Sequence, residues 1–107
     1  MYRIIWRYTI NPDFLDEFLK WYAADGEWAK FFRKSTNKYM GTDLLKSADN
    51  PLEYLTIDRW KSKSAYEVFR AANSTEYSKI DTLCERFTTD EKLLGKYFKA
   101  DPSTHPN

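Results

Sequence analysis

The chain has 107 residues, a length that suits one domain, and its net charge of +1 balances 17 lysines and arginines against 16 aspartates and glutamates. This balance, without a basic stripe, argues against a nucleic-acid partner, and no apolar run approaches the roughly 20 residues of a membrane-spanning helix. Aromatic residues make up 18% of the chain although its mean hydropathy is −0.74, so many large rings need a core, a pocket or a subunit interface.

Two further features of the sequence point to the cytosol. Cys84 is the only cysteine, so an internal disulfide is excluded, and a lone thiol fits a reducing compartment. The first ten residues, MYRIIWRYTI, lack the basic region, apolar block and small-residue cleavage site of a signal peptide. We therefore expect a cytoplasmic protein that binds neither a membrane nor a nucleic acid.

The first third of the chain predicts a strand followed by two helices. In residues 2–10 apolar side chains occupy every second position, which is typical of a strand with one buried face. Residues 11–22 change to helical spacing, and Asn11 is a favourable N-cap for that helix. Gly26 interrupts the pattern, and we expect Asp25 to cap a short second helix.

The middle of the chain predicts a hairpin followed by a helix. Residues 39–46 and 53–60 both suit strands, and the turn sequence SADNP between them indicates an antiparallel pair. At Trp60 the spacing of apolar residues changes from two to the helical period, and Ser62 is placed to cap the helix. The stretch YLTIDRWKSKSAYEVFR is therefore a strand followed directly by a helix.

The last part of the chain predicts another helix, a strand and a short tail. After the break NST, apolar residues from Tyr77 to Phe87 continue at helical spacing. Residues 91–99 suit a final strand in which Gly95 marks a bulge or a close approach of backbones. We interpret residues 101–107 as a frayed tail, so that a single domain covers residues 1–100.

This order of elements, β-α-β-β-α-β, predicts an α+β fold of the ferredoxin-like type. Its sheet has four antiparallel strands, with the helices on one face. The other face has no helix to cover it and is too apolar to be left in water. We therefore expect a homodimer in which two such faces pack together across a two-fold axis. The expected residues of this face are three aliphatic ones, Ile5, Leu55 and Ile57, among three arginines, Arg3, Arg7 and Arg59.

The residue inventory excludes most catalytic systems that need histidine. The only histidine, His105, lies in the proline-containing tail, so a Ser-His-Asp or Cys-His system has no base. An H-x-x-x-H zinc site and a histidine-ligated haem are excluded for the same reason. The three widely separated glycines form no phosphate-binding loop. We expect no metal and no cofactor, and we interpret Cys84 as an inert core thiol.

The strand at residues 53–60 carries the most unusual combination of side chains. On one face it places Tyr54, Thr56, Asp58 and Trp60, so a carboxyl shares a buried face with two rings. Asp58 is either a desolvated carboxylate with a raised pKa, or the partner of a nearby arginine or lysine, or a residue near the open end of the sheet. Trp60 either forms the wall of a cleft or seals the core.

The segment YLTIDRWKSKSAYEVF, from Tyr54 to Phe69, resembles the third strand and second helix of antibiotic biosynthesis monooxygenase domains. In that family a hydrophobic strand ends in Trp, one residue and Ser, and a helix with Ala and an aromatic residue follows. The segments DGEWAKFFRKS and YMGTDLL also resemble a subgroup of small, mostly uncharacterised members. The resemblance extends from Tyr2 to about Phe98 and implies the dimeric α+β barrel fold.

The resemblance to the haem-degrading members of this superfamily is incomplete. Those members, as the resemblance implies, use an Asn on the first strand, the Trp before the Ser-capped helix, and a haem-ligating His on the following helix. Trp60 matches the Trp, whereas Trp6 stands at the Asn position and the His position falls near Asp81. Because the haem ligand is missing, we do not expect haem degradation.

The resemblance to cofactor-independent oxygenases leads to a specific hypothesis. Such enzymes oxidise electron-rich phenols, hydroquinones or anthrones with dioxygen, and the protein supplies an apolar cavity, a proton acceptor and hydrogen-bond donors. We predict catalytic roles for Asp58, as the proton acceptor, and for Trp60. The residues predicted to contact the aromatic substrate are Trp6, Tyr8, Trp28, Tyr54 and Tyr66. The alternative is a non-catalytic small-molecule-binding or stress-related protein of the same dimeric fold.

Overall fold

The computed structural model describes residues 1–100; the predicted tail at 101–107, with His105, lies outside the described residues. Residues 1–100 form four strands and four α-helices, with short 3-10 turns at Pro12–Phe14 and Glu85–Phe87. In chain order the elements are β1 (Tyr2–Ile10), α1 (Leu15–Tyr22), α2 (Glu27–Ser35), β2 (Tyr39–Lys46), β3 (Glu53–Trp60), α3 (Lys63–Ala72), α4 (Ser74–Cys84) and β4 (Thr88–Phe98).

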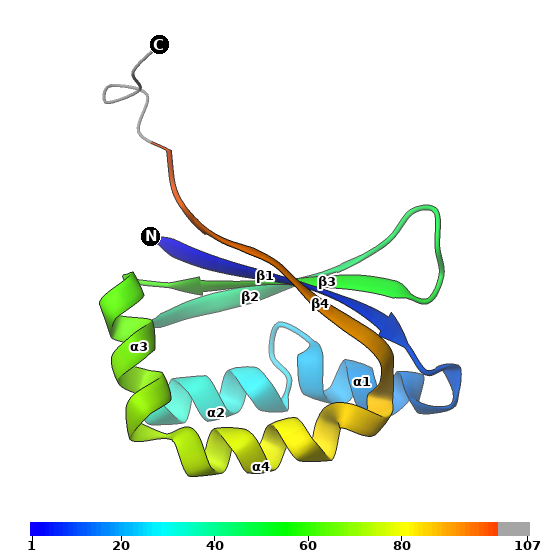
Figure 1. The fold of residues 1–107 in the computed structure, drawn as a ribbon, viewed down its shortest axis with the longest axis horizontal. Helices are drawn as coiled ribbons and strands as arrows, with labels where there is room; N and C mark the ends of the chain where they lie inside the picture. Colours follow the sequence, from blue (N-terminus) through cyan, green and yellow to red (C-terminus); the bar gives the residue numbers. More distant parts are fainter. Residues whose placement is uncertain (101–107) are drawn as a thin grey trace.

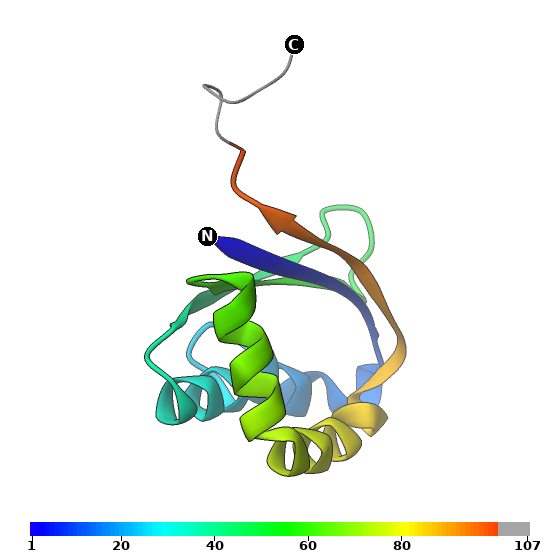
Figure 2. The same ribbon diagram turned by 60° about the vertical axis from the view of Figure 1, so that its left-hand side comes forward.

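The four strands form one antiparallel sheet in the order β2-β3-β1-β4. The helices lie together on one face of this sheet, below the strands in Figure 1, and Figure 2 shows the other face free of helices. Both helical connections therefore return the chain to the same side. The predicted α+β, ferredoxin-like fold is confirmed, with each predicted helical region divided into two helices.

Two helix starts form through the predicted capping side chains. The Asn11 side-chain oxygen accepts a hydrogen bond from the Asp13 N–H at 3.1 Å, which caps the 3-10 turn ahead of α1. The Ser62 hydroxyl accepts one from the Ala65 N–H, also at 3.1 Å, at the start of α3. Such bonds satisfy amide groups that have no partner inside the helix. They explain why the chain enters each helix where it does.

The start of α2 differs from the prediction. Its N-cap is Gly26 and not Asp25, and no side chain caps the helix. Gly26 lies against the end of α1, where an added Cβ would be only 2.6 Å from the Lys20 carbonyl oxygen. A glycine is therefore required at this corner, and it takes the position that we had predicted for the aspartate.

Gly95 lies at a bulge in the last strand, as predicted. Ile5 of β1 is opposite Gly95 and the next residue, Trp6, is opposite Leu93, so Leu94 is an extra residue in β4. The strand begins at Thr88, three residues earlier than predicted, because its first residue already pairs with Ile10. The bulge changes which side chains of β4 face the helices along its length.

A second bulge, which was not predicted, lies in β2. Tyr39 is opposite Trp60 and Gly41 is opposite Arg59, so Met40 is the extra residue. Gly41 has φ of +128°, a conformation that favours glycine. Because of the extra residue, both Tyr39 and Thr42 turn toward the helices and are buried. In a regular strand two residues three positions apart would lie on opposite faces.

We expect Gly41→Ala to lower the free energy of unfolding by about 1–3 kcal/mol, because an alanine is strained in this backbone conformation. Urea denaturation measures the loss. The matched control is Met40→Ala at the neighbouring bulge residue, whose side chain is 45% exposed and whose removal should change stability little. Equal stability of the two variants would contradict the strain argument.

The core between the sheet and the helices consists largely of aromatic rings. Trp60, Phe18 and Ile10 are the largest side chains that are completely buried. Cys84 is buried as well, and burial raises the pKa of its thiol to about 12, as expected of a core cysteine. Within residues 1–100 no helix has both the length and the apolar character needed to cross a membrane.

The helix-free face of the sheet combines apolar and charged side chains, as predicted. Ile5 and Ile57 are paired across β1 and β3, and both are partly exposed. Leu45 in the neighbouring strand is 47% exposed. Arg59 forms an ion pair with Asp43 on this face, with 3.6 Å between Nε and Oδ2. This surface carries more exposed aliphatic side chains than a solvated sheet face requires.

Candidate functional site

A cavity of about 220 Å³ lies between the sheet and the helices. Strands β1, β2, β3 and β4 contribute one side of its wall, and the helical segments contribute the other. Its lining combines aromatic, hydroxyl and charged side chains with two alanines. The lining residues are Trp6, Tyr8, Tyr22, Ala23, Trp28, Ala29, Phe32, Thr42, Thr56, Asp58, Arg70, Tyr77, Asp81 and Glu91.

Aromatic rings in mutual contact form most of the cavity wall. Tyr8 and Tyr22 have ring centroids 4.8 Å apart, and Trp28 and Tyr77 have centroids 5.0 Å apart. The Trp6 ring stacks against Tyr8 with a centroid distance of 6.4 Å. Rings that pack on one another keep their positions when the cavity is filled. The wall is therefore suited to hold a flat apolar ligand.

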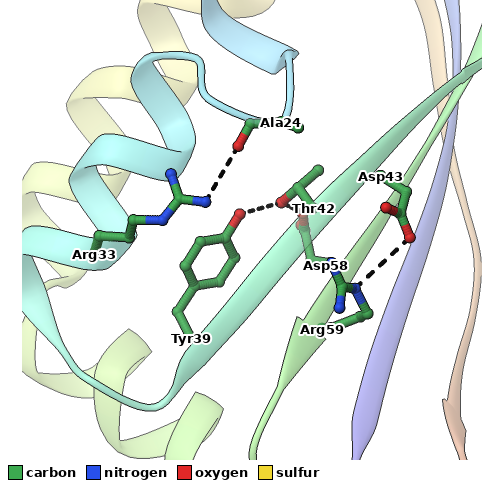
Figure 3. Close-up of polar contacts among 7 residues, drawn as sticks. All are labelled: Ala24, Arg33, Tyr39, Thr42, Asp43, Asp58 and Arg59. Carbon is green, nitrogen blue, oxygen red and sulfur yellow. Dashed lines mark hydrogen bonds and ion pairs between the residues drawn. The ribbon is translucent and has the colours of Figure 1, made fainter.

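Asp58 is the carboxyl that lies deepest in this cavity. It is directly opposite Thr42 in the pairing of β2 with β3. The Thr42 hydroxyl donates a hydrogen bond to Asp58 Oδ1 at 2.6 Å, and the Tyr39 hydroxyl bonds to the same Thr42 oxygen (Figure 3). No ion pair to Asp58 forms within residues 1–100. Of the alternatives left open by the sequence, the structure shows the desolvated carboxyl, without an ion partner in this part of the chain.

Burial raises the pKa of Asp58 from 3.8 to about 6, against the opposing effect of the hydrogen bond from Thr42. The side chain keeps some accessible surface, and it lines the cavity. A carboxyl in an apolar surrounding resists ionisation because its charge loses hydration. Asp58 is therefore a group that can gain and release a proton near neutral pH and that a ligand in the cavity can reach.

The raised pKa predicts a pH-dependent difference between the wild type and Asp58→Asn. The folded-state pKa lies above the unfolded one, so ionised Asp58 destabilises the fold above pH 6 and this effect disappears as the pH falls from about 6 to 4. We therefore compare the free energy of unfolding of Asp58→Asn with that of the wild type at two pH values. The variant's value minus the wild-type value should be more positive at pH 8 than at pH 4 by on the order of 2 kcal/mol. Urea denaturation at both pH values measures this difference, and a pH-independent difference would contradict it.

Three charged residues, Arg70, Asp81 and Glu91, are the exposed members of the lining and mark the mouth of the cavity. The Arg70 guanidinium lies 3.7 Å from the centre of the Tyr77 ring and donates a hydrogen bond to the Tyr66 hydroxyl at 3.0 Å. Partial burial raises the pKa of Glu91, and nearby Asp81 adds to this effect. The mouth therefore has a fixed cation beside two carboxylates.

Four of the seven residues predicted for the site line the cavity: Trp6, Tyr8, Trp28 and Asp58. The other three lie outside the lining. Trp60 is 0% exposed, enclosed by Phe32, Tyr39, Tyr66 and Phe69 with centroid distances of 5.0–5.4 Å. Tyr54 is buried against Phe18, and Tyr66 packs on Trp60.

Other lining residues were missed or assigned elsewhere by sequence reasoning. The helical spacing of Tyr77 and Phe87 is typical of core residues, but Tyr77 lines the cavity from α4. Thr42 was not singled out, because the bulge that turns it inward leaves no clear pattern in the sequence. Arg70 and Glu91 belong to segments that are otherwise exposed. Only the packing of α3, α4 and β4 around the cavity assembles them.

Several polar groups at or near the site have no hydrogen-bond partner within residues 1–100. They include the Thr56 hydroxyl and the Trp28 indole N–H, both in residues that line the cavity. Both atoms have almost no accessible surface of their own, and Tyr8 lies beside Thr56 while Tyr22 and Cys84 lie beside Trp28, so these groups belong to the polar backing of the cavity wall. In the same part of the chain, no group of three or more His, Cys, Asp or Glu residues is arranged to hold a metal ion.

A ferredoxin-like domain with a ring-lined cavity between its sheet and its helices defines a class of small α+β proteins, and the sequence family agrees with it. Residues 1–79 match the family model described as antibiotic biosynthesis monooxygenase. The match covers well over half of the chain, and the protein belongs to this family. No curated protein matches the sequence.

Solved structures share the fold at low sequence identity. A crystal structure described as an antibiotic biosynthesis monooxygenase has a TM-score of 0.69 at 18% identity and covers 94% of this chain and 100% of its own. A conserved protein from Methanosarcina mazei Go1 has a TM-score of 0.69 at 12% identity, with 92% of each chain covered. A protein from Pseudomonas aeruginosa has a TM-score of 0.64 at 14% identity, with 94% of each covered. These likenesses establish the fold.

Proposed function

We propose that this protein is a cofactor-independent monooxygenase that oxidises an electron-rich aromatic substrate of the quinol or anthrone type with dioxygen. One observation carries the proposal: Asp58, a carboxyl with a pKa of about 6 and no cationic partner within residues 1–100, opens onto a cavity walled by aromatic rings. Family membership supports it.

The proposed chemistry begins with a proton transfer to Asp58. A base with a pKa near the working pH is suited to take a proton from an acidic phenol or from the activated CH₂ group of an anthrone. The anion that remains is electron-rich and is the reductant of dioxygen. In the oxidation of a CH₂ group, one oxygen atom forms the new carbonyl and the other is released as water. The water takes up two hydrogens, as many as the CH₂ group loses, and a proton that Asp58 releases to solvent is replaced by one from solvent.

The test is the fate of labelled oxygen. The protein is mixed with anthrone, with trimethylhydroquinone or with 1-naphthol under ¹⁸O₂, and the products are analysed by mass spectrometry. A monooxygenase places one labelled atom in the organic product and the other in water. Uptake that yields only hydrogen peroxide and unlabelled quinone, or that equals the protein-free rate, would overturn the proposal.

A second function, non-catalytic binding of an aromatic small molecule, is favoured by the size of the cavity. Its volume of about 220 Å³ lies below the roughly 300–1,000 Å³ typical of ligand pockets, which leaves little space for dioxygen beside a large substrate. Binding of 1-naphthol in calorimetry without any labelled product would support this second function over the first. Both functions place the protein in the cytosol, where Cys84 stays reduced.

The proposal includes a homodimer that forms through the helix-free face of the sheet. We expect sedimentation to show a dimer at micromolar concentration and Ile57→Asp to shift it toward monomer, because a charge would replace an aliphatic side chain in the interface. The matched control is Val68→Asp on α3, where the original side chain is 68% exposed on the helical side. A wild-type monomer, or equal dissociation of both variants, would contradict this interface.

A further inference from the structure

A continuous chain of hydrogen bonds leads from Asp58 to Tyr39. Thr42 lies between them: its hydroxyl donates to the Asp58 carboxylate and bonds in turn to the Tyr39 hydroxyl (Figure 3). Asp58 and Thr42 line the cavity, whereas Tyr39 does not. The hydrogen-bond chain therefore starts at a residue that lines the cavity, Asp58, and ends at one that does not, Tyr39.

The bulge in β2 brings the Tyr39 and Thr42 members of this hydrogen-bond chain together. Because Met40 is an extra residue, Tyr39 and Thr42 face the same side of the sheet with their hydroxyls in contact. Without the bulge, Thr42 would still be opposite Asp58, but Tyr39 would point to the other face. Thr42 supplies the hydrogen bond that Asp58 receives in the described part of the chain. The bulge adds a third member, Tyr39, which bonds to Thr42 and not to Asp58.

The hydrogen-bond chain ends toward one edge of the sheet, and the cavity mouth lies toward the opposite edge. Tyr39 belongs to β2, which is one edge strand, whereas Glu91 at the mouth belongs to β4, the other edge strand. The exposed Arg33 covers Tyr39, with its guanidinium carbon 5.4 Å from the ring centre, and donates to the Ala24 carbonyl at 3.4 Å. Tyr39 is 7% exposed, so a proton that follows the hydrogen-bond chain would reach solvent at the small exposed part of this residue, beside Arg33, while a ligand fills the mouth.

The members of the chain have the chemistry that a proton relay requires. A hydroxyl can accept a proton on its oxygen while it releases its own, so it transfers charge without a lasting change in its bonds. Burial raises the pKa of Tyr39, so its phenol remains neutral and keeps the proton that the relay needs. No other titratable group is hydrogen-bonded to Asp58 within the described residues.

We propose that Thr42 and Tyr39 form a proton relay that returns the substrate's proton from Asp58 to solvent at the β2 edge of the sheet. This relay rests on the proposed role of Asp58 as the base. The substrate X–H bond breaks and an Asp58 O–H bond forms; Asp58 then passes the proton to Thr42, Thr42 passes its own to Tyr39, and Tyr39 releases one to water. One proton leaves, no electron moves, and rotation of the hydroxyls restores the starting arrangement.

The relay is tested with 4-nitrophenol, whose ionisation changes its absorbance and whose electron-poor ring resists oxidation. A stopped-flow pH jump on the preformed complex measures how fast the bound phenol exchanges its proton with solvent. We expect Tyr39→Phe to slow this exchange by about tenfold or more without a change in the dissociation constant, because only the O–H group is lost. High concentrations of imidazole should restore the rate by carrying the proton from the cavity.

Three variants complete the test. Thr42→Val should also slow the exchange, and Thr42→Ser, which keeps a hydroxyl, should restore it. Tyr2→Phe removes a hydroxyl from a tyrosine that is buried outside the cavity lining and should behave as wild type. If Thr42→Val does not fold, Tyr39→Phe decides alone, since it keeps the ring.

The outcomes separate the relay from the proposed function. An unchanged exchange rate in Tyr39→Phe, or a slow rate that imidazole does not restore, would overturn the relay and leave Tyr39 as a positioning residue for Asp58. Fast exchange that depends on Tyr39, together with no labelled product from any aromatic substrate, would support the relay and overturn the oxygenase. Failure of wild type to bind 4-nitrophenol would overturn both.

Discussion

Asp58→Asn is expected to lower the rate of substrate-dependent oxygen uptake by about 10²–10⁴-fold, the usual contribution of a positioned proton acceptor. Asparagine keeps the size of the side chain and can still accept the hydrogen bond from Thr42. It cannot take a proton from the substrate at neutral pH. The loss should therefore appear in turnover, with little change in the affinity for a substrate analogue.

The pH profile provides a second readout for this variant. In the wild type, the rate should rise with pH through an apparent pKa near 6, because only ionised Asp58 accepts a proton. This rise should be absent from the residual rate of Asp58→Asn. Asp49→Asn in the exposed β2–β3 turn is the matched control and should keep the wild-type rate and profile. Equal rates in Asp58→Asn and the wild type would remove Asp58 from the mechanism.

Trp60→Ala is expected to lower the free energy of unfolding by about 3–5 kcal/mol, the usual effect of removing a fully buried tryptophan. The indole is 0% exposed and packs against four rings, so its removal leaves a cavity that this rigid cluster cannot close. For a domain of this size such a loss is a large fraction of the total stability. Urea denaturation measures the change directly.

Trp21→Ala is the matched control for this substitution. Trp21 is only partly buried, and its nearest ring, Trp28, lies 6.5 Å away, so truncation should destabilise the protein less. Trp60→Phe should recover part of the lost stability because it refills most of the space. A Trp60→Ala protein that is as stable as wild type but inactive would return Trp60 to a catalytic role.

Much of the architecture follows from the sequence because it depends on local patterns. The alternation in residues 2–10 and 53–60 predicts strands whose inward faces are buried in the structure. Asn11 and Ser62 predict helix starts because their side chains bond to amides two or three residues away. The inward direction of Asp58 and its desolvation follow from the same alternation, since a carboxyl on a buried face loses water.

The composition of the site could be predicted only in part. Trp6 and Tyr8 line the cavity because strand alternation turns them toward the helices. Trp60 lies on the same predicted face but is fully enclosed, because α3 follows it directly and packs Phe69 over its ring. Alternation determines the face of a side chain and does not reveal whether another element covers it.

The sequence by itself determined the order of the elements, the ferredoxin-like fold and the placement of a carboxyl among inward-facing rings. Only the tertiary structure decided that Asp58 has a hydroxyl partner and, within residues 1–100, no cationic one, and that Trp60 belongs to the core. The tertiary structure also showed that Met40 forms a bulge. Because of this bulge, Tyr39 and Thr42 face the same side of the sheet and their hydroxyls form a hydrogen bond. The physical reason is that capping and alternation act over a few residues, whereas a cavity and its hydrogen bonds arise where distant segments meet.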